Sequence, residues 1–227
     1  MLAAGAFFIG AFTLGVTAHD RITTRVTWDR EIEPIFTARC VHCHRPGGRS
    51  TIPLMTYQQA RPWAVAIKEE VLTRRMPKWS AARGYGDFAN DPSLAPFEIA
   101  LIAAWVDGGA PENEKNKVGA APITPTAKPA VFTPPPDSSV RTISSGCGGQ
   151  PASGKLLAIR PILDKNGSAA VAAIFPTGRH EIIAWIRDYD PDFATTYWLR
   201  HAMALPKGSR LEVQSLGTCS IQLTFAR

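Results

Sequence analysis

Cys40, Cys43 and His44 are the residues whose types and spacing point most directly to chemistry. The two thiols lie three positions apart, so they share one side of a single helical turn. Each thiol can add across a vinyl group of a porphyrin to give a thioether, and the histidine after the second cysteine can ligate the iron. Residues 40–44 therefore predict one covalent c-type haem, with Cys40 and Cys43 as thioethers and His44 as proximal ligand.

Two other uses of a Cys-x-x-Cys pair have to be weighed against haem attachment. A redox dithiol would be expected in a thioredoxin-like setting, and no strand followed by a helix is indicated at Cys40. Half of a zinc site would need a second Cys/His pair at ligand spacing, and Cys147 and Cys219 stand far off and singly. Haem attachment is the interpretation that the spacing favours.

Met76 is the candidate for the second axial ligand. It directly precedes Pro77, and a residue before proline is pushed towards extended backbone, which would project its side chain at the mouth of a loop. Core packing is the more ordinary use of a methionine. Met55 is the rival distal ligand, and His42 is a weaker third because it lies inside the attachment turn. A thioether ligand would favour ferrous iron and raise the reduction potential.

Three helices are expected to position these ligands. The first begins with a cap at Thr27 and continues into the attachment turn, where Pro46-Gly47-Gly48 ends it. Thr56 can cap the second helix, from Tyr57 to about Arg75. The third runs from Pro96 to the Gly108-Gly109 stop. The apolar faces expected to point inward are Ile32, Ile35, Phe36 and Cys40 in the first helix, Trp63, Ile67, Val71 and Leu72 in the second, and Ile99, Ile102, Ala103 and Val106 in the third.

Residues 80–95 are rich in turn formers and are expected to be a loop, with Trp79 before it packed on the haem edge or the third helix.

The run from Trp28 to Pro111 resembles the monohaem cytochrome c domain of bacterial exported multidomain proteins. The resemblance lies in residues 40–44, 60–63, 75–79 and 104–111. It implies a small all-α fold over residues 19–113 and supports Met76 as the distal ligand.

The N-terminal segment and the overall charge limit where the protein is expected to work and what it is expected to bind. Residues 1–18 are uncharged and mostly apolar, so they are expected to be a signal peptide or a retained N-terminal membrane anchor. Either outcome places the folded part in the periplasm or another extracytoplasmic space. The formal net charge of +6 is spread without a basic run, so nucleic acid is excluded as an expected partner.

The composition changes after the helical part. Residues 114–137 are rich in proline and are expected to be a semi-rigid linker. From residue 138 onward, short β-prone runs separated by turns predict a small β-sandwich or jelly-roll-like domain, with Asn166-Gly167 as a hairpin turn. The runs are 155–163, 169–175, 180–186, 198–203, 210–213 and 220–225. A disulfide between Cys147 and Cys219 would close a loop of about 70 residues and contribute about 4 kcal/mol.

Residues 172–179, 188–193 and 205–213 make this second half similar to the C-terminal β-sandwich of the copper type II ascorbate-dependent monooxygenases. The His-x-His pair that the family uses for copper is replaced here by Leu156-Leu157-Ala158-Ile159-Arg160, and no methionine follows Met203. Copper is therefore not expected. His180 and His201 are interpreted as surface or strand-edge histidines.

The sequence thus predicts an α+β multidomain protein, with an all-α cytochrome c domain followed by a small all-β domain. The expected function is electron transfer by an exported monohaem cytochrome rather than catalysis. Its expected partners are redox proteins, including a membrane-bound respiratory or photosynthetic complex, with the β domain used for docking. A haem-fed copper monooxygenase and a haem-based sensor or gas-binding module are the alternatives.

Overall fold

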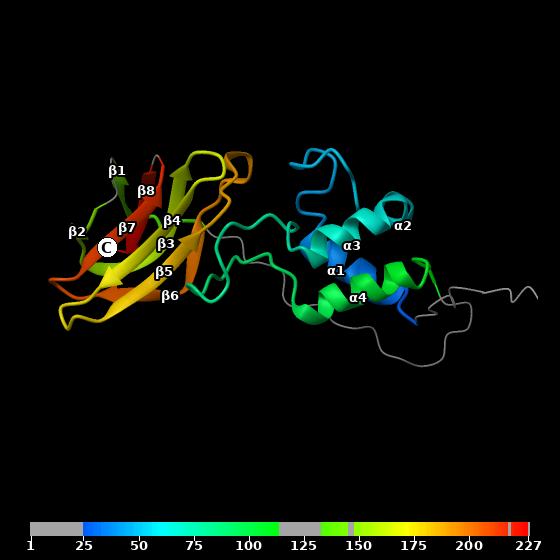
Figure 1. Ribbon diagram of the computed structural model, residues 1–227, viewed down its shortest axis with the longest axis horizontal. Helices are drawn as coiled ribbons and strands as arrows, with labels where there is room; N and C mark the ends of the chain where they lie inside the picture. The colour runs from blue at the N-terminus through cyan, green and yellow to red at the C-terminus, as the bar shows by residue number, and fades with distance from the viewer. Residues whose placement is uncertain (1–24, 114–132, 145–147, 218, 227) are drawn as a thin grey trace, which may run out of the picture.

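The computed structural model describes residues 25–113, 133–144, 148–217 and 219–226. Within these ranges the chain is a mixed helix-and-sheet protein, which confirms the coarse α+β prediction. The helices gather in one part, here called the helical unit (residues 25–76 and 96–113). The strands gather in another, here called the β-sandwich (residues 139–226), and the two lie side by side in Figure 1. Residues 1–18 and most of the expected linker, 114–132, lie outside the described residues.

The first helical segment consists of a π-helical turn, η1 (Trp28–Ile32), followed by α1 (Glu33–Arg39). Thr27 takes the N-cap position with extended backbone, as predicted, but its side chain does not make the capping bond. Instead the backbone N–H of Thr27 donates to the carboxylate of Glu31 at 2.8 Å. The Glu31 carboxylate thus satisfies the backbone N–H of the N-cap residue, while the Thr27 hydroxyl leaves the N–H groups of the first turn uncapped.

The predicted second helix is shorter than expected and broken in the middle. It is divided into α2 (Tyr57–Ala60), the 3-10 turn η2 (Arg61–Trp63) and α3 (Ala64–Leu72). Pro62 has no backbone N–H to donate, which accounts for the break. The helix ends at Leu72 rather than Arg75, because Arg74 adopts a left-handed backbone with φ of 56°.

The inward face predicted for this helix is wrong at two positions. The side chains of Trp63 and Leu72 are 45% and 51% exposed, whereas Val71 is buried and Ile67 is half-buried. Small residues, Ala60 and Ala64, take the inward positions instead. The break at η2 changes the rotation of the chain about the helix axis, so a single helical period does not describe both halves.

The third helix, α4 (Pro96–Asp107), has the predicted limits. Its most buried aromatic is Trp105, which the periodicity did not single out. Trp105 forms an aromatic cluster with Trp28 and Phe36, with ring centroids 5.8 and 6.3 Å from it. The indole of Trp105 donates to the carbonyl of Pro111 at 2.9 Å, and the N–H of Trp28 donates to the same carbonyl at 3.0 Å. These bonds hold the two ends of the helical unit together.

Over the residues that the structure describes, the β-sandwich consists of two four-stranded antiparallel sheets, in the orders β1-β8-β3-β6 and β2-β7-β4-β5. Its strands are β1 (Ser139–Ser144), β2 (Gln150–Pro151), β3 (Gly154–Leu163), β4 (Ser168–Ile174), β5 (His180–Ile186), β6 (Tyr197–Leu205), β7 (Arg210–Leu216) and β8 (Cys219–Ala226). The six predicted runs are confirmed, with ends that shift by a few residues. β1 and β2 were missed, since neither has a continuous apolar run.

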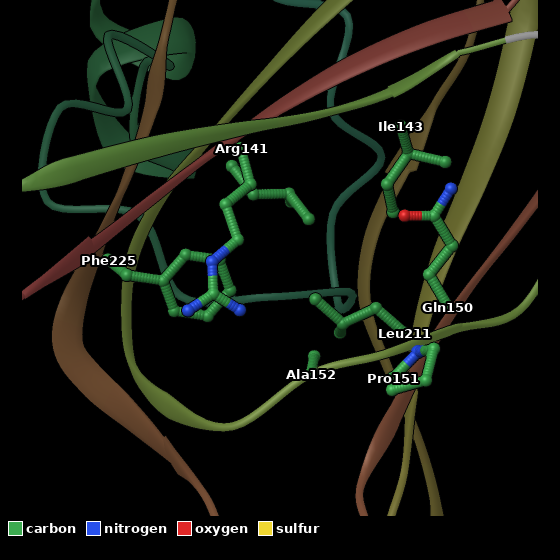
Figure 2. Close-up of a pocket in the computed structure, with 8 residues that line it drawn as sticks. Arg141, Ile143, Gln150, Pro151, Ala152, Leu211 and Phe225 are labelled. Atoms are coloured by element: carbon green, nitrogen blue, oxygen red, sulfur yellow. The ribbon is translucent and has the colours of Figure 1, made fainter.

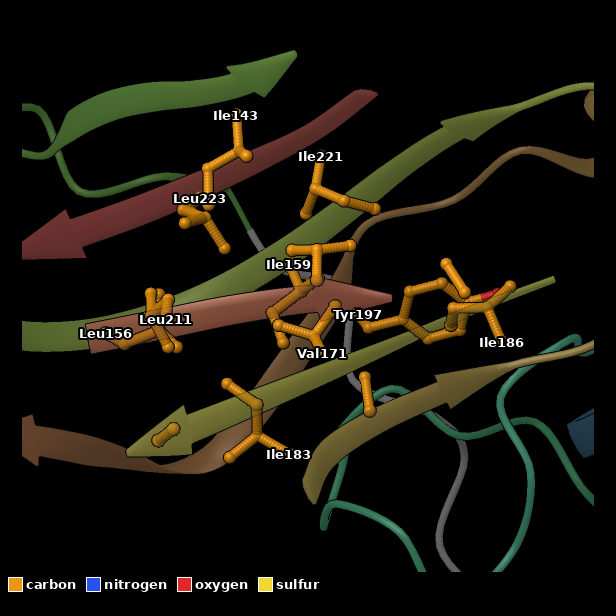
Figure 3. Close-up of a cluster of buried hydrophobic side chains, with 14 of the residues drawn as sticks. Ile143, Leu156, Ile159, Val171, Ile183, Ile186, Tyr197, Leu211, Ile221 and Leu223 are labelled. Carbon is orange, nitrogen blue, oxygen red and sulfur yellow. The ribbon is translucent and has the colours of Figure 1, made fainter. Parts of the chain in front are cut away.

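The core of the β-sandwich lies between the two sheets. Buried side chains from both sheets meet there, as Figure 3 shows for Ile159 of β3, Val171 of β4, Ile183 of β5 and Leu223 of β8. The predicted hairpin at Asn166-Gly167 is wrong, because β3 and β4 belong to different sheets. That turn carries the chain from one sheet to the other, with Asn166 in the left-handed region at φ 62°.

Residues 77–95, here called the connecting loop, leave the helical unit after α3 and return to it at α4. Between these points the loop runs along two edge strands of the β-sandwich. Ala81 pairs with Ile186 of β5, the edge of one sheet, and Phe88 pairs with Leu199 of β6, the edge of the other. Ala81 and Phe88 are both buried in the core of the β-sandwich. The loop therefore covers two edges that would otherwise be open to pairing with another chain.

Candidate functional site

The Cys40–His44 turn continues the last turn of α1. The N–H of Cys40 donates to the carbonyl of Phe36 at 2.8 Å, and the N–H groups of Cys43 and His44 donate to the carbonyl of Cys40 at 3.1 and 3.0 Å. This compact turn sets both sulfurs on one short stretch of backbone. Both thiols are free and half-buried. The turn keeps Cys40, Cys43 and His44 within one short stretch of helical backbone, and their use in haem attachment stays a prediction.

The imidazole of His44 is oriented by the backbone of a later residue. Its Nδ1 lies 2.9 Å from the carbonyl oxygen of Ile52. A carbonyl accepts only, so Nδ1 carries the proton in this pair and Nε2 is left with its lone pair. A histidine held in this way through one ring nitrogen presents the other as a metal ligand of fixed orientation. Sequence reasoning missed Ile52, although Pro53 after it was a sign of extended backbone there.

The segment after the attachment turn folds back over it. The N–H of Ser50 donates to the carbonyl of Cys43 at 3.1 Å, and the N–H of Leu54 donates to the carbonyl of His44 at 3.0 Å. At Gly48 the backbone approaches so closely that an added Cβ would lie 2.2 Å from the carbonyl oxygen of Cys43. Glycine is required there by this contact. The Pro46-Gly47-Gly48 stretch therefore does more than end the helix, because it lets the next segment reach His44.

A buried ion pair lies beside Cys40. The Nε of Arg39 is 3.4 Å from the Oε1 of Glu98, with the two side chains 5% and 0% exposed. Glu98 also accepts at Oε2 from the N–H of Ala95, at 2.7 Å, and so caps the start of α4. An acidic residue in the first turn of a helix opened by proline is a recognisable capping signal. Its pairing with Arg39 depends on how the helices cross.

The environment of Cys40 differs from that of a redox thiol. Burial, with a smaller contribution from the charge of Glu98, raises the pKa of the Cys40 thiol to about 12. Reactive cysteines of Cys-x-x-Cys oxidoreductases have a lowered pKa, because the thiolate is the attacking species. This comparison disfavours the redox-dithiol alternative.

The two candidate methionine ligands lie on different segments from the attachment turn. Met76 follows α3, its side chain is half-buried, and its N–H donates to the carbonyl of Glu70 at 3.2 Å. The Met76–Pro77 peptide bond is cis. Met55 is 41% exposed and its N–H donates to the side-chain oxygen of Gln59. His42 is exposed. The assignment of Met76 as distal ligand stays a prediction.

Trp79 does not pack on the third helix, which was one of its two expected places, whereas packing on the haem edge stays a prediction. Its ring packs against Tyr197 of β6, with centroids 4.6 Å apart, and against Phe88 of the connecting loop at 6.0 Å. Trp79 thus belongs to the contact between the connecting loop and the β-sandwich rather than to the third helix. Sequence reasoning could not find Tyr197 as its partner, since the two residues come from segments joined only by the tertiary fold.

The remaining cysteines and histidines lie in the second half of the chain. Cys219 is buried at the start of β8. Cys147 lies outside the described residues, so the Cys147–Cys219 pairing stays a prediction. His180 on β5 and His201 on β6 are both exposed, as expected. In the part of the chain that the structure describes, no three His, Cys, Asp or Glu side chains gather as a protein-only metal site.

The β-sandwich has a small pocket at the end lined by β1, β2, β7 and β8 (Figure 2). Arg141, Gln150, Leu211 and Phe225 are among its lining residues. The guanidinium of Arg141 lies 4.7 Å from the centre of the Phe225 ring, which holds the cation over an aromatic face. Nothing in this pocket resembles a reactive site.

The residues of the attachment turn fit a covalent haem. Two free thiols sit on one turn, and the histidine beside them has one nitrogen bonded to a carbonyl and the other left as a lone-pair donor. Comparison of the chain with models of known protein families gave no match, and comparison with curated protein sequences gave none. None of the helices within the described ranges is long and apolar enough to cross a membrane.

Proposed function

We propose that this chain is a c-type cytochrome that transfers electrons, carrying one covalent haem on Cys40 and Cys43. The observation that carries the proposal is the 2.9 Å contact from the Nδ1 of His44 to the carbonyl of Ile52, next to two free thiols on one turn. A bound haem of this type supplies one-electron exchange between ferrous and ferric iron. The small all-α cytochrome c domain of residues 19–113 is part of the same proposal.

The roles of the protein residues follow from their positions. Cys40 and Cys43 would tether the porphyrin through thioethers, and His44 would offer Nε2 to the iron. The carbonyl of Ile52 keeps that imidazole in one tautomer and one orientation, which also makes it a stronger donor. Met76 would supply the second axial ligand. With His44 and Met76 both holding the iron, the chain itself would need no acid, base or nucleophile.

The surroundings of the turn support a role that depends on rigidity. Electron transfer is faster at a site whose geometry changes little between oxidation states, because fewer of the surrounding atoms have to move. The Arg39–Glu98 pair, the Gly48 contact and the aromatic cluster at Trp105 all restrain the turn or the helices behind it. We further propose that the protein works outside the cytoplasm, where it exchanges electrons with other redox proteins.

The experiment is to express the full chain with a working haem-attachment apparatus and to purify it under denaturing conditions. A red polypeptide, with the added mass of one haem and a pyridine haemochrome of the c type, is expected. Replacing both Cys40 and Cys43 with serine is expected to give a colourless chain of unmodified mass. A colourless wild-type chain would overturn the proposal.

A second experiment, on the native protein, distinguishes the electron-transfer hypothesis from the gas-sensor hypothesis. The ferrous wild-type protein is expected to be low-spin and to take up little carbon monoxide, because both axial positions are occupied. Ready uptake of carbon monoxide would point to an open sixth position and to the sensor alternative. Stoichiometric copper in the purified protein would favour the monooxygenase alternative over both.

A further inference from the structure

We propose that the β-sandwich holds Met76 in place as the axial ligand, so that Trp79, Phe88 and Tyr197 are positioning residues for the haem iron. The inference rests on the proposed function, in which Met76 binds that iron. It gives the β-sandwich a structural role within the same chain, in place of or besides docking to a partner. The observations that carry it are the contacts of the connecting loop, which begins directly after Met76.

Met76 sits between two anchors. On one side, the N–H groups of Arg75 and Met76 donate to the carbonyl of Glu70, at 2.9 and 3.2 Å, which ties the residue to the last turn of α3. On the other side, Trp79 packs at 4.6 Å on Tyr197. Three residues of chain span at most about 10 Å, so the position of Trp79 limits where Met76 can go.

The anchor on the β5 side is made of backbone pairing. The N–H of Arg187 donates to the carbonyl of Ser80 at 2.8 Å, and the N–H of Ala82 donates to the carbonyl of Trp185 at 2.7 Å. Both bonds flank the pairing of Ala81 with Ile186. Tyr85 then packs edge-on against the ring of Trp185, with centroids 4.9 Å apart. The loop is thus added as a short strand to this edge of the sheet.

Gly86 marks where the loop presses closest to the same edge. Its backbone has φ of 77°, a conformation that other residues rarely adopt. An added Cβ would lie 2.3 Å from the carbonyl oxygen of Ile183 on β5. The contact is therefore a close fit of backbone on backbone.

The anchor on the β6 side combines backbone and side-chain bonds. The N–H of Ala89 donates to the carbonyl of Trp198 at 2.9 Å, and the N–H of Arg200 donates to the carbonyl of Asp87 at 2.8 Å. The side chain of Asn90 donates to the carbonyl of Thr196 at 2.7 Å and accepts from the N–H of Trp198 at 3.0 Å. The guanidinium of Arg200 adds an ion pair with the carboxylate of Asp87 at 3.0 Å.

These contacts couple the position of the loop to the state of Met76. If Met76 left the iron by a shift of its backbone, the following residues would move with it, and such movement would break the packing of Trp79 and Phe88 on Tyr197. The bound state is therefore favoured by the free energy of those aromatic contacts. Weakening them should raise the population in which the sulfur is off the iron.

The experiment compares two Phe→Leu variants in the full-length, haem-loaded protein. Phe88→Leu removes a ring that touches Trp79 and Tyr197. Phe225→Leu is the matched control, a buried phenylalanine on β8 at the pocket end of the β-sandwich. The readouts are the weak charge-transfer band of a thioether bound to ferric iron, and the fraction of ferrous protein that takes up carbon monoxide at a fixed low concentration.

Phe88→Leu is expected to reduce the charge-transfer band and to raise the carbon monoxide-bound fraction about fivefold, whereas Phe225→Leu changes neither. Arg200→Gln, with Arg179→Gln as its surface ion-pair control, provides a milder second test, with an expected increase of about twofold for Arg200→Gln alone. Because Arg200 is exposed, this variant is expected to fold normally.

The outcomes distinguish a failure of methionine ligation from a failure of the positioning role. A wild-type protein without the thioether band would overturn methionine ligation and, with it, the positioning role. A wild-type protein that shows the band, with Phe88→Leu and Arg200→Gln indistinguishable from their controls, would overturn the positioning role alone. Equal losses in Phe88→Leu and Phe225→Leu would also overturn it, since general destabilisation would then be the cause.

Discussion

Arg39 and Glu98 form a buried ion pair across 59 residues of sequence, with 3.4 Å between Nε and Oε1. Arg39 is the last residue of α1, directly before the attachment turn, and Glu98 lies in the first turn of α4. The pair therefore joins α1, which leads into the Cys40–His44 turn, to the start of α4. A carboxylate with no exposed surface is tolerated because it meets both a guanidinium and a backbone N–H.

Glu98→Gln should lower the free energy of unfolding by about 3 kcal/mol, because it leaves the buried charge of Arg39 without its counter-charge. The measurement is denaturant unfolding followed by tryptophan fluorescence, which Trp28 and Trp105 report from the same core. Asp107→Asn is the control, since it breaks a more exposed ion pair, with Lys68, in the same unit. If both substitutions lowered the free energy of unfolding equally, burial would not make the Arg39–Glu98 pair more important for stability than the exposed pair.

His44→Ala should abolish the low-spin ferrous spectrum, while His42→Ala should leave it unchanged. The reason is that His44 has a ring nitrogen fixed by a backbone carbonyl, whereas His42 is exposed within the same turn. Absorption spectra of the reduced proteins make the comparison. Loss of the spectrum in His42→Ala with retention in His44→Ala would reverse the assignment.

Met76→Ala should remove the thioether charge-transfer band and lower the reduction potential, since a sulfur ligand stabilises ferrous iron. Carbon monoxide uptake by the ferrous protein should rise from almost none to nearly complete. Met55→Ala is the paired control and should change neither property. If Met55→Ala alone produced these changes, Met55 would be the distal ligand.

The stability of the protein should fall in strongly alkaline solution through Tyr197. Burial raises the pKa of its phenol to about 12, above the ordinary value of 10 that applies in the unfolded chain. The unfolded state therefore ionises first, so the stabilisation is complete below about pH 10 and is lost as the pH rises towards 12. Across that range the loss should reach about 3 kcal/mol. Tyr197→Phe should show a shallower decline in unfolding experiments, and parallel curves for the two proteins would contradict this account.

Much of the fold could be predicted because local patterns agree with the final structure. α4 starts at Pro96 and ends before Gly108, as punctuation by proline and glycine indicated. Six of the eight strands in the described residues were predicted for the same reason, since alternating apolar residues and turn formers act over short distances. The second helix failed at Pro62 and Arg74, where a missing donor and a left-handed backbone override the apolar period.

Some residues of the candidate site could likewise be predicted from the sequence, and others could not. Cys40, Cys43 and His44 could be recognised from the sequence because their chemistry depends on spacing within one turn. Ile52 and Glu98 could not, because a backbone carbonyl carries no residue-type signal and an ion pair across 59 residues depends on how two helices cross. The expectation that Trp79 packs on the third helix failed for the same reason, because its partner Tyr197 lies in the other half of the chain.

The sequence alone thus determined the candidate attachment turn, the limits of α4 and most strands, because each depends on residues within a few positions of one another. Only the tertiary structure decided what surrounds them. The connecting loop, whose turn-rich residues predicted no more than a loop, became part of the β-sandwich because two edge strands offered unpaired backbone groups and a gap that Phe88 and Ala81 fill. Such pairing depends on which edges the completed fold leaves open, and no local pattern encodes that.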